Sequence, residues 1–317
     1  MDIMSLFALG TGVSVFMLGM LLIKHSLGEN FSRKSEELLN KFTSGRLSAT
    51  AVGTLATAVL QSSSASSVIT ATLVDNGSLS LYGAFWIIVG ANLGTTFTGL
   101  LTAVSLSEIA PFAVVAGIAL ISLTKRKLFH GIGVFFAGFG LLFIGMNMME
   151  TAATGIKDSP VLYSMLESCS SPFTGIITGS FFTALIQSSA AVTALLQTMA
   201  YDGILGIRQA FYIILGSNIG TCATCLIAST GLGGGAKKVA YMHVIYNLAG
   251  SLLFVLLSLF IPLPEIVQSI FPDNVKLQIG ALNVIFNGAS AIIALILPIK
   301  KKKQDLHFVS PVVKYSR

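Results

Sequence analysis

A twelve-residue segment occurs twice in this chain, and its two copies lie 126 residues apart. AFWIIVGANLGT at 84–95 returns as AFYIILGSNIGT at 210–221, with eight of the twelve positions identical. The same offset, without a gap, carries Gln61-Ser62-Ser63 onto Gln187-Ser188-Ser189. Two unlike polar motifs thus repeat in register, which predicts a fold made of two related halves.

The composition predicts a polytopic membrane protein. Of the 317 residues, 54% are hydrophobic and 10% are charged, whereas soluble domains carry about 25% charged residues. We therefore expect a plasma-membrane protein surrounded by the lipid bilayer. Seven stretches are long enough to cross about 30 Å as helices, and they lie near 3–23, 81–104, 108–124, 130–149, 207–229, 239–260 and 276–299.

The stretches 46–75 and 171–202 differ from the spans, because each has two apolar arms with Gln-Ser-Ser between them. The arm 47–60 is too short to span, since its helix would be only about 21 Å long. We predict that both stretches are re-entrant hairpins, which enter the membrane, turn at the polar motif and leave on the same side. Non-helical backbone at that depth is tolerated only inside protein or beside water.

The basic residues predict the orientation. With seven spans and two hairpins, 16 of the 19 Lys and Arg residues fall on one face, which is the cytoplasmic one. This places the N-terminus outside and the C-terminus inside, and it explains the net charge of +6 without a nucleic-acid partner.

Each half then holds three crossings, so the second half is inserted upside down as an inverted repeat. We expect the first repeat at 1–128 and the second at 129–260, each with a span, a hairpin, a broken span (81–104 or 207–229) and another span. An extra C-terminal span at 261–299 and a basic cytoplasmic tail at 300–317 follow.

The hairpin tips are the first candidate site. At the start of each second arm, free backbone N–H groups, serine hydroxyls and the helix dipole suit an oxyanion. The alternative is close packing by small residues, with the serines bonded to their own helix. Two copies, each with a glutamine at the same place, favour the site.

The second motif, at 90–96 and 216–222, places two glycines and an asparagine in mid-span. These residues weaken a helix and predict a local break, whose carbonyls and threonine hydroxyls would suit Na⁺. A glycine notch for helix packing is the alternative.

His243 and Asn247 share one helix face, where a hydrogen-bonded pair between helices is at least as plausible as a role in the site. Asn283 and Asn287 repeat that spacing, and there packing is the better interpretation.

No Lys or Arg lies in the predicted core of any span or hairpin. An anionic substrate would therefore be balanced by co-bound cations and helix N-termini, which favours cation-coupled transport over a basic anion pore. Paired acids, HExxH and a nucleophile elbow are also missing from the sequence, so an enzyme is not expected.

The motif pair, Q-S-S-[SA] followed by G-[AS]-N-[IL]-G-T, resembles the type II sodium-dependent phosphate cotransporters and their bacterial relatives over roughly 3–260. The resemblance implies sodium-coupled movement of inorganic phosphate by alternating access, with no cofactor beyond co-transported Na⁺. It assigns phosphate binding to Gln61, Ser62, Ser63, Ser64, Asn92, Gln187, Ser188, Ser189 and Asn218. It assigns sodium binding to Ser64, Gly94, Thr95, Thr96, Ser189, Gly220 and Thr221, with His243 and Asn247 as a supporting polar pair.

The chain departs from the family pattern at Ala190, where a hydroxyl is lost, and at Cys222, where a serine or threonine is usual. The region 110–122 of the third span lacks the family's aspartate, so we expect two Na⁺ per HPO₄²⁻.

Two alternatives to a sodium-coupled phosphate importer remain. The first is a transporter of another oxyanion or a phosphate exporter, and the second is a non-transporting phosphate-sensing subunit. The tail after the last span is about 17 residues long, so regulation would need a separate phosphate-regulatory protein. The oligomeric state is left open.

Overall fold

The computed structural model describes residues 3–28, 43–103, 108–124, 126–156 and 169–299, and every regular element in these ranges is helical. The first half contains α1 (Ile3–Gly28), α3 (Arg46–Leu60), α4 (Ser63–Asp75), α5 (Leu81–Thr102) and α6 (Ala110–Leu123). The second contains α7 (Lys127–Ile156), α9 (Pro172–Ile186), α10 (Ser189–Tyr201), α11 (Ile207–Gly220), α12 (Cys222–Thr230) and α13 (Gly234–Ser258). Two further helices, α14 (Leu263–Ile270) and α15 (Val275–Ile296), follow; α14 was not predicted. The predicted cytoplasmic tail lies outside the described residues.

Five helical segments of the described chain are long and apolar enough to cross a membrane: Leu81–Thr102, Lys127–Met149, Ile207–Thr230, Gly234–Ser258 and Val275–Ile296. They correspond to five of the seven predicted spans. In the other two, the apolar runs Phe7–Ile23 and Ala110–Leu123 are shorter. Large apolar side chains such as Phe112 and Leu123 are exposed, as expected for surfaces that face lipid. The chain is therefore an integral membrane protein.

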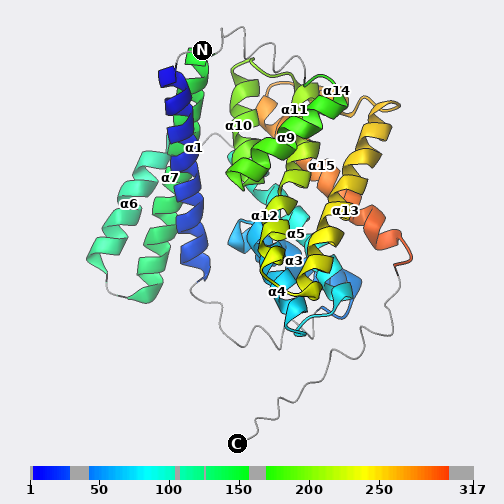
Figure 1. Cartoon of the computed structure of the whole chain (residues 1–317). Coiled ribbons are helices and arrows are strands. Elements are labelled where there is room, and N and C mark those ends of the chain that lie inside the picture. Colours follow the sequence, from blue (N-terminus) through cyan, green and yellow to red (C-terminus); the bar gives the residue numbers. More distant parts are fainter. Residues whose placement is uncertain (1–2, 29–42, 104–107, 125, 157–168, 300–317) are drawn as a thin grey trace, which may run out of the picture.

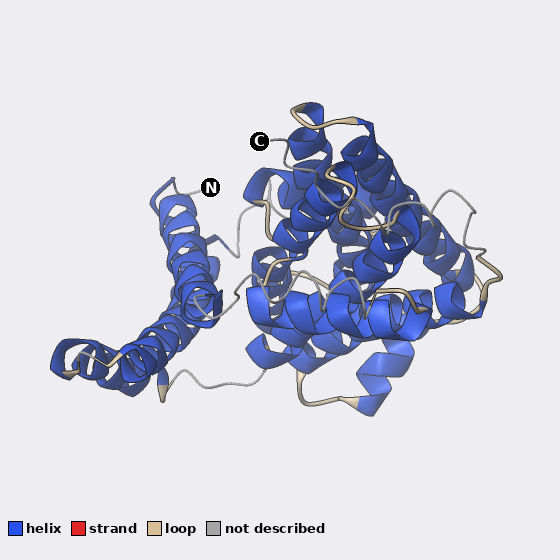
Figure 2. Ribbon diagram, turned by 90° about the horizontal axis from the view of Figure 1, so that it is seen from below, coloured by secondary structure: helices blue, strands red, loops and turns tan. Residues whose placement is uncertain are grey.

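Helices α1, α6 and α7 form a three-helix group beside a larger bundle that holds both hairpins (Figures 1 and 2). Glycines join α1 to α7 in a reciprocal way. A Cβ on Gly12 would lie 3.0 Å from the carbonyl oxygen of Gly145, and one on Gly19 would lie 2.6 Å from that of Gly138. Because 12 and 138, and 19 and 145, are the same positions of the two halves, each half presents the same surface to the other. The pairing also shows that α1 and α7 run antiparallel.

Glycines also seat each hairpin against the helix that follows it. A Cβ on Gly94 would lie 2.5 Å from the carbonyl oxygen of Thr54, and one on Gly220 would lie 2.5 Å from that of Ser180. These two contacts are related by the 126-residue offset. The α3–α5 contact and the α9–α11 contact therefore have the same geometry, and glycine is required in both because the backbones approach so closely.

The predicted helix break is wrong for the first repeat. Helix α5 runs without interruption from Leu81 to Thr102, because its glycines are used for packing and its backbone remains helical through the motif. In the second repeat α11 ends at Gly220 and α12 begins at Cys222, with Thr221 between them. The two copies of the motif thus differ in backbone structure.

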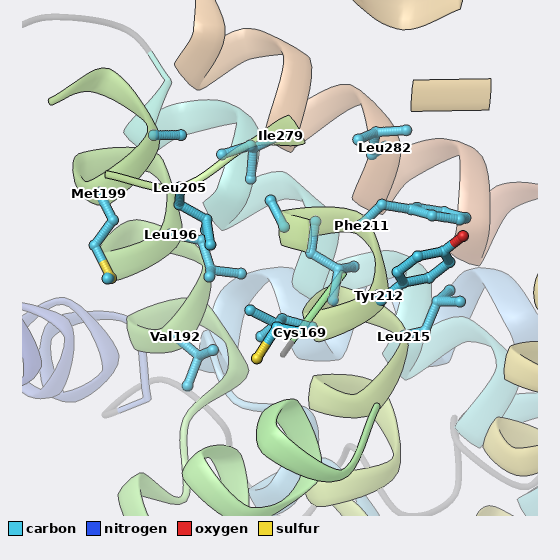
Figure 3. Close-up of a cluster of buried hydrophobic side chains, with 14 of the residues drawn as sticks. Cys169, Val192, Leu196, Met199, Leu205, Phe211, Tyr212, Leu215, Ile279 and Leu282 are labelled. Atoms are coloured by element: carbon cyan, nitrogen blue, oxygen red, sulfur yellow. The ribbon is translucent and has the colours of Figure 1, made fainter. Parts of the chain in front are cut away.

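The core of the second half is a cluster in which α10, α11 and α15 meet. Leu196 of α10, Phe211 of α11, and Ile279 and Leu282 of α15 are buried together (Figure 3). The extra helix α15 therefore packs in the core of the folded protein.

Asp75, the last residue of α4, joins the first hairpin to α13. Its carboxylate accepts hydrogen bonds from the backbone N–H groups of Gly233 at 2.8 Å, Gly235 at 3.1 Å and Ala236 at 3.3 Å. These donors, Gly233 foremost, hold the pKa of Asp75 below its usual range, although desolvation opposes them. The carboxylate thus caps the N-terminus of a neighbouring helix.

We expect this cap to make the fold acid-sensitive. Because the folded pKa is lowered, the stabilisation is complete above the unfolded pKa of about 3.9 and is lost as pH falls through the folded value. Thermal unfolding in detergent between pH 3 and pH 7 should show wild type losing more stability below about pH 4 than Asp75→Asn. Parallel pH profiles for the two proteins would contradict the cap.

Candidate functional site

The two hairpin tips meet at one cavity of about 190 Å³. It is lined by the first tip, the second tip, α1 and one residue of α5: Leu60, Gln61, Ser62, Ser63, Ser64; Gln187, Ser188, Ser189, Ala190; Met17, Met20, Leu21; and Thr95. Every lining residue is neutral. The structure thus brings together seven predicted phosphate residues, and Thr95 of the predicted sodium set, from segments more than 100 residues apart.

The same local geometry builds both tips. Gln61 and Gln187 adopt left-handed backbone conformations, with φ of 51° and 59°, and no other non-glycine residue in the described chain has a positive φ. This conformation ends α3 and α9 and reverses the chain. Ser62 and Ser188 then cap α4 and α10, accepting hydrogen bonds from the N–H groups of Ala65 at 3.1 Å and Ala191 at 3.2 Å.

The N-termini of α4 and α10 both open into the cavity. The first N–H groups of a helix have no intrahelical acceptor, so those of Ser63, Ser64, Ser189 and Ala190 are available at this place. Each capping serine hydroxyl accepts one bond and keeps its own proton to donate. Two helix N-termini and several hydroxyls therefore present donors and a positive potential to the same small volume.

Gln61 offers a different chemistry. Its side chain is buried, and its carboxamide oxygen has no hydrogen-bond partner among the described residues. A carbonyl oxygen is an acceptor, so it suits a cation or a protonated oxyanion rather than a bare anionic oxygen. Gln187, its counterpart, is exposed, so the two tips are not equivalent.

The other predicted sodium residues lie outside the cavity lining. The hydroxyls of Thr96 and Thr221 donate to carbonyls of their own helices, those of Leu93 at 2.7 Å and Asn218 at 2.6 Å. Gly94 and Gly220 are the packing glycines of the hairpin contacts. Thr95 lines the cavity and also donates to its own helix, at 3.0 Å from the carbonyl oxygen of Ala91.

Asn92 and Asn218 meet Asn247 in a separate buried polar cluster. The Asn247 side chain accepts from Asn92 Nδ2 and donates to the carbonyl oxygen of Asn218 at 2.6 Å and to Cys222 Sγ at 3.3 Å. Because Asn92 and Asn218 are equivalent positions of the two halves, Asn247 ties the two motif helices to α13. His243, one turn away, is fully buried, and neither ring nitrogen has a hydrogen-bond partner among the described residues.

Two features near the site were not predicted from the sequence: the α1 residues that line the cavity, and the contacts of Gln197 between helices. Met17, Met20 and Leu21 of α1 form an apolar wall of the cavity; the repeat of Gly19-Met20 at Gly145-Met146 was a signal, because it showed that α1 belongs to the duplicated unit. Gln197 of α10 was also missed. It donates to the carbonyl oxygens of Gly99 at 2.8 Å and Lys276 at 3.0 Å, joining α10 to α5 and α15.

The fold and the site define an integral membrane protein in which two related helical hairpins meet tip to tip at a cavity without charged side chains among the described residues that line it. The chain belongs to the Na⁺/Pi-cotransporter family, whose model matches residues 15–151 and 159–271. This is a family of transporters, not of enzymes, and it connects the chain with phosphate transport.

Relatives agree with the family. YqeW of Bacillus subtilis is 32% identical over 284 residues, which are 88% of this chain and 90% of the relative. The Putative inorganic phosphate export protein YjbB of Escherichia coli K12 is 22% identical over 79% of this chain and 46% of its own length. The rat sodium-dependent phosphate transport protein 2C is 35% identical over 30% of this chain and 16% of its own length. The chain thus spans less than half of the two relatives with phosphate names, and no solved structure matches it.

Proposed function

We propose that this chain is a secondary transporter that couples Na⁺ to the movement of inorganic phosphate by alternating access. The observation that carries the proposal is the meeting of two equivalent hairpin tips, each with a helix N-terminus, at one cavity. A tetrahedral oxyanion between the tips would accept from the N–H groups of Ser63, Ser64 and Ser189 and from the tip hydroxyls.

Sodium supplies the positive charge in this proposal. No charged side chain lines the cavity within the described residues, so the charge of the oxyanion is balanced by Na⁺ and by helix dipoles. Neutral oxygens are available for Na⁺ at Gln61 Oε1 and Thr95. We propose two Na⁺ per HPO₄²⁻, so that transport moves little net charge. A large phosphate-induced current in proteoliposomes would contradict this stoichiometry.

The halves are proposed to form an inverted repeat in the plasma membrane, with the N-terminus outside and the C-terminus inside. Antiparallel α1 and α7, joined by reciprocal glycine contacts, are what a two-fold axis in the membrane plane produces. Hairpin arms of 15 residues, Arg46–Leu60 and Pro172–Ile186, fit re-entrant segments. Accessibility of single cysteines at Asp75 and Asp202 tests this: in an inverted repeat they label from opposite sides, and labelling from one side would exclude inversion.

The decisive experiment is the flux of ³²P-phosphate into liposomes that contain the purified protein. Uptake should follow an inward sodium gradient and disappear when K⁺ replaces Na⁺. Flux that ignores sodium would overturn the coupling. Competition by arsenate but not by sulfate would assign the substrate to phosphate rather than to oxyanions in general.

Export is the second candidate, because the chain aligns over 79% of its length with a protein named for phosphate export. The two directions use the same site and differ in the gradient that drives it. Release of labelled phosphate from loaded vesicles distinguishes the two directions. An exporter that does not use sodium releases phosphate whether or not a sodium gradient is present. A sodium symporter releases phosphate only when sodium is present on the same side of the membrane as the phosphate.

A further inference from the structure

Helix α15 lies outside the residues that match the family and outside the duplication, yet it occupies a position equivalent to that of α13. Helix α13 packs on α4 of the first hairpin, and α15 packs on α10 of the second. The two helices also bury the same face. Adding 40 to each of the eight buried positions of α13, so that 243 becomes 283 and 247 becomes 287, reaches a buried position of α15 every time.

With this offset of 40 residues, Asn283 corresponds to His243 and Asn287 corresponds to Asn247. Asn287 Nδ2 donates to Asn283, to Oδ1 at 2.8 Å and to the backbone oxygen at 3.0 Å. Asn287 is 1% exposed, and its Oδ1 has no hydrogen-bond partner among the described residues. A buried carbonyl oxygen without a partner is costly, and it points to a ligand.

The contacts of α15 with α10 place Asn287 at the level of the second hairpin tip. Gln197 binds the carbonyl oxygen of Lys276. One turn earlier on α10 and two turns later on α15, Thr193 and Asn283 both approach Gly99, at 3.3 and 3.6 Å from a Cβ built there. The two helices therefore run antiparallel. Continuing by one turn of about 6 Å brings Asn287 opposite Ser189 and Ala190.

The contacts of α15 with α5 place Asn287 within about one helical turn of the same level. Arg46 binds both Tyr82 of α5 and the carbonyl oxygen of Leu295, which fixes one end of the contact. Gly280 against Gly99 fixes the other. Asn287 lies midway between these contacts on α15, and the midpoint on α5 falls at Gly90 and Ala91, about one helical turn from Thr95 of the cavity.

The second half lacks an oxygen at this level. Ala190 stands where the first half has Ser64, and both residues line the cavity. We propose that Asn287 Oδ1 supplies the missing oxygen ligand for one co-transported Na⁺, so that α15 completes the second half of the site. This inference rests on the proposed sodium coupling. Amide carbonyl oxygens are ligands that Na⁺ accepts in transporters without a carboxylate.

The test replaces Asn287 with leucine, which keeps the volume and removes the oxygen. The sodium concentration for half-maximal phosphate uptake should rise about tenfold or more, which corresponds to losing one interaction. The phosphate concentration for half-maximal uptake at saturating Na⁺ should stay within about twofold. Gln278→Leu is the matched control. It also removes a buried amide oxygen of α15 that has no hydrogen-bond partner among the described residues. This oxygen lies near Lys276 and far from the tip, so its removal should leave sodium dependence unchanged.

A second readout does not need transport. Na⁺, but not K⁺, should raise the thermal unfolding temperature of the wild type in detergent, and Asn287→Leu should remove this difference. Adding Ala190→Ser, which restores the hydroxyl that the first half has, should recover it. Should Asn287→Leu fail to fold, Asn287→Asp keeps an oxygen, adds charge and should lower the sodium concentration required.

Wild-type sodium dependence in Asn287→Leu or in Asn287→Asp overturns the inference. So does a lower unfolding temperature of Asn287→Leu in Na⁺ and K⁺ alike, with the difference between the two salts unchanged, because that result assigns Asn287 to packing. If the wild type itself shows no sodium effect on flux or on unfolding, the sodium coupling of the proposed function fails instead.

Discussion

Alanine in place of Ser63 or Ser189 is expected to lower sodium-dependent phosphate uptake by about 10- to 100-fold. Both residues are the first of their helices, both are buried, and both line the cavity where the two tips meet. Each change removes a hydroxyl that can donate to the oxyanion, and a hydrogen bond to a charged group contributes about 1.5–3 kcal/mol. Initial rates of ³²P uptake in proteoliposomes measure the loss.

Ser67→Ala is the matched control for this experiment. Ser67 lies one turn further along α4 and is fully buried, but it does not line the cavity, and its hydroxyl has no partner among the described residues. Its removal should leave uptake at the wild-type rate. Wild-type uptake in Ser63→Ala and Ser189→Ala together would remove the hairpin tips from the mechanism.

The location of the hairpins was readable from the sequence for a physical reason. Glutamine and serines between two short apolar arms cannot sit in lipid unless the chain turns there inside protein. The structure has its turn at Gln61 and at Gln187. The left-handed glutamine conformation was not predicted, because glycine and asparagine are the residues usually expected at such a turn.

The second motif was harder to interpret, because glycine has two uses that look alike in a sequence. Gly90 and Gly94 were expected to weaken α5, but in the structure they let α3 approach it. Only the contact partner, which lies on another helix, distinguishes a packing glycine from a helix break. Thr221 marks a break in the second copy, although its motif has the same glycines.

Long-range polar contacts were also beyond the sequence. The H-x-x-x-N spacing showed that His243 and Asn247 share a face, but not that Asn247 would meet Asn92 and Asn218 together. Asn283 and Asn287 were interpreted as packing residues for the same reason, because spacing shows a shared helix face but not the residues that this face contacts. Their relation to α13 appears only when the partners of both helices, α4 and α10, are compared.

The largest effect on folding should come from the glycines that seat the hairpins. A Cβ on Gly90 would overlap the carbonyl oxygen of Thr50, and one on Gly216 would overlap that of Ile176. Backbone atoms on both sides cannot rotate away, so Gly90→Ala and Gly216→Ala should each force the hairpin arm off its helix. We expect a loss of about 3 kcal/mol of stability and a matching fall in the thermal unfolding temperature in detergent.

Gly288→Ala separates this packing effect from the general effect of adding a methyl group to a helix. Gly288 lies within α15, and a Cβ built there meets nothing within 4 Å, so alanine should stabilise the helix by about 1 kcal/mol. If the unfolding temperature rises in Gly288→Ala and falls in Gly90→Ala and Gly216→Ala, the tight hairpin contacts explain the loss of stability. Unfolding temperatures that rise in all three variants would mean that α3 and α9 do not pack so closely. Because those contacts hold Gln61 and Gln187 at the ends of α3 and α9, a destabilised hairpin should also lose phosphate uptake, even though neither glycine touches the cavity.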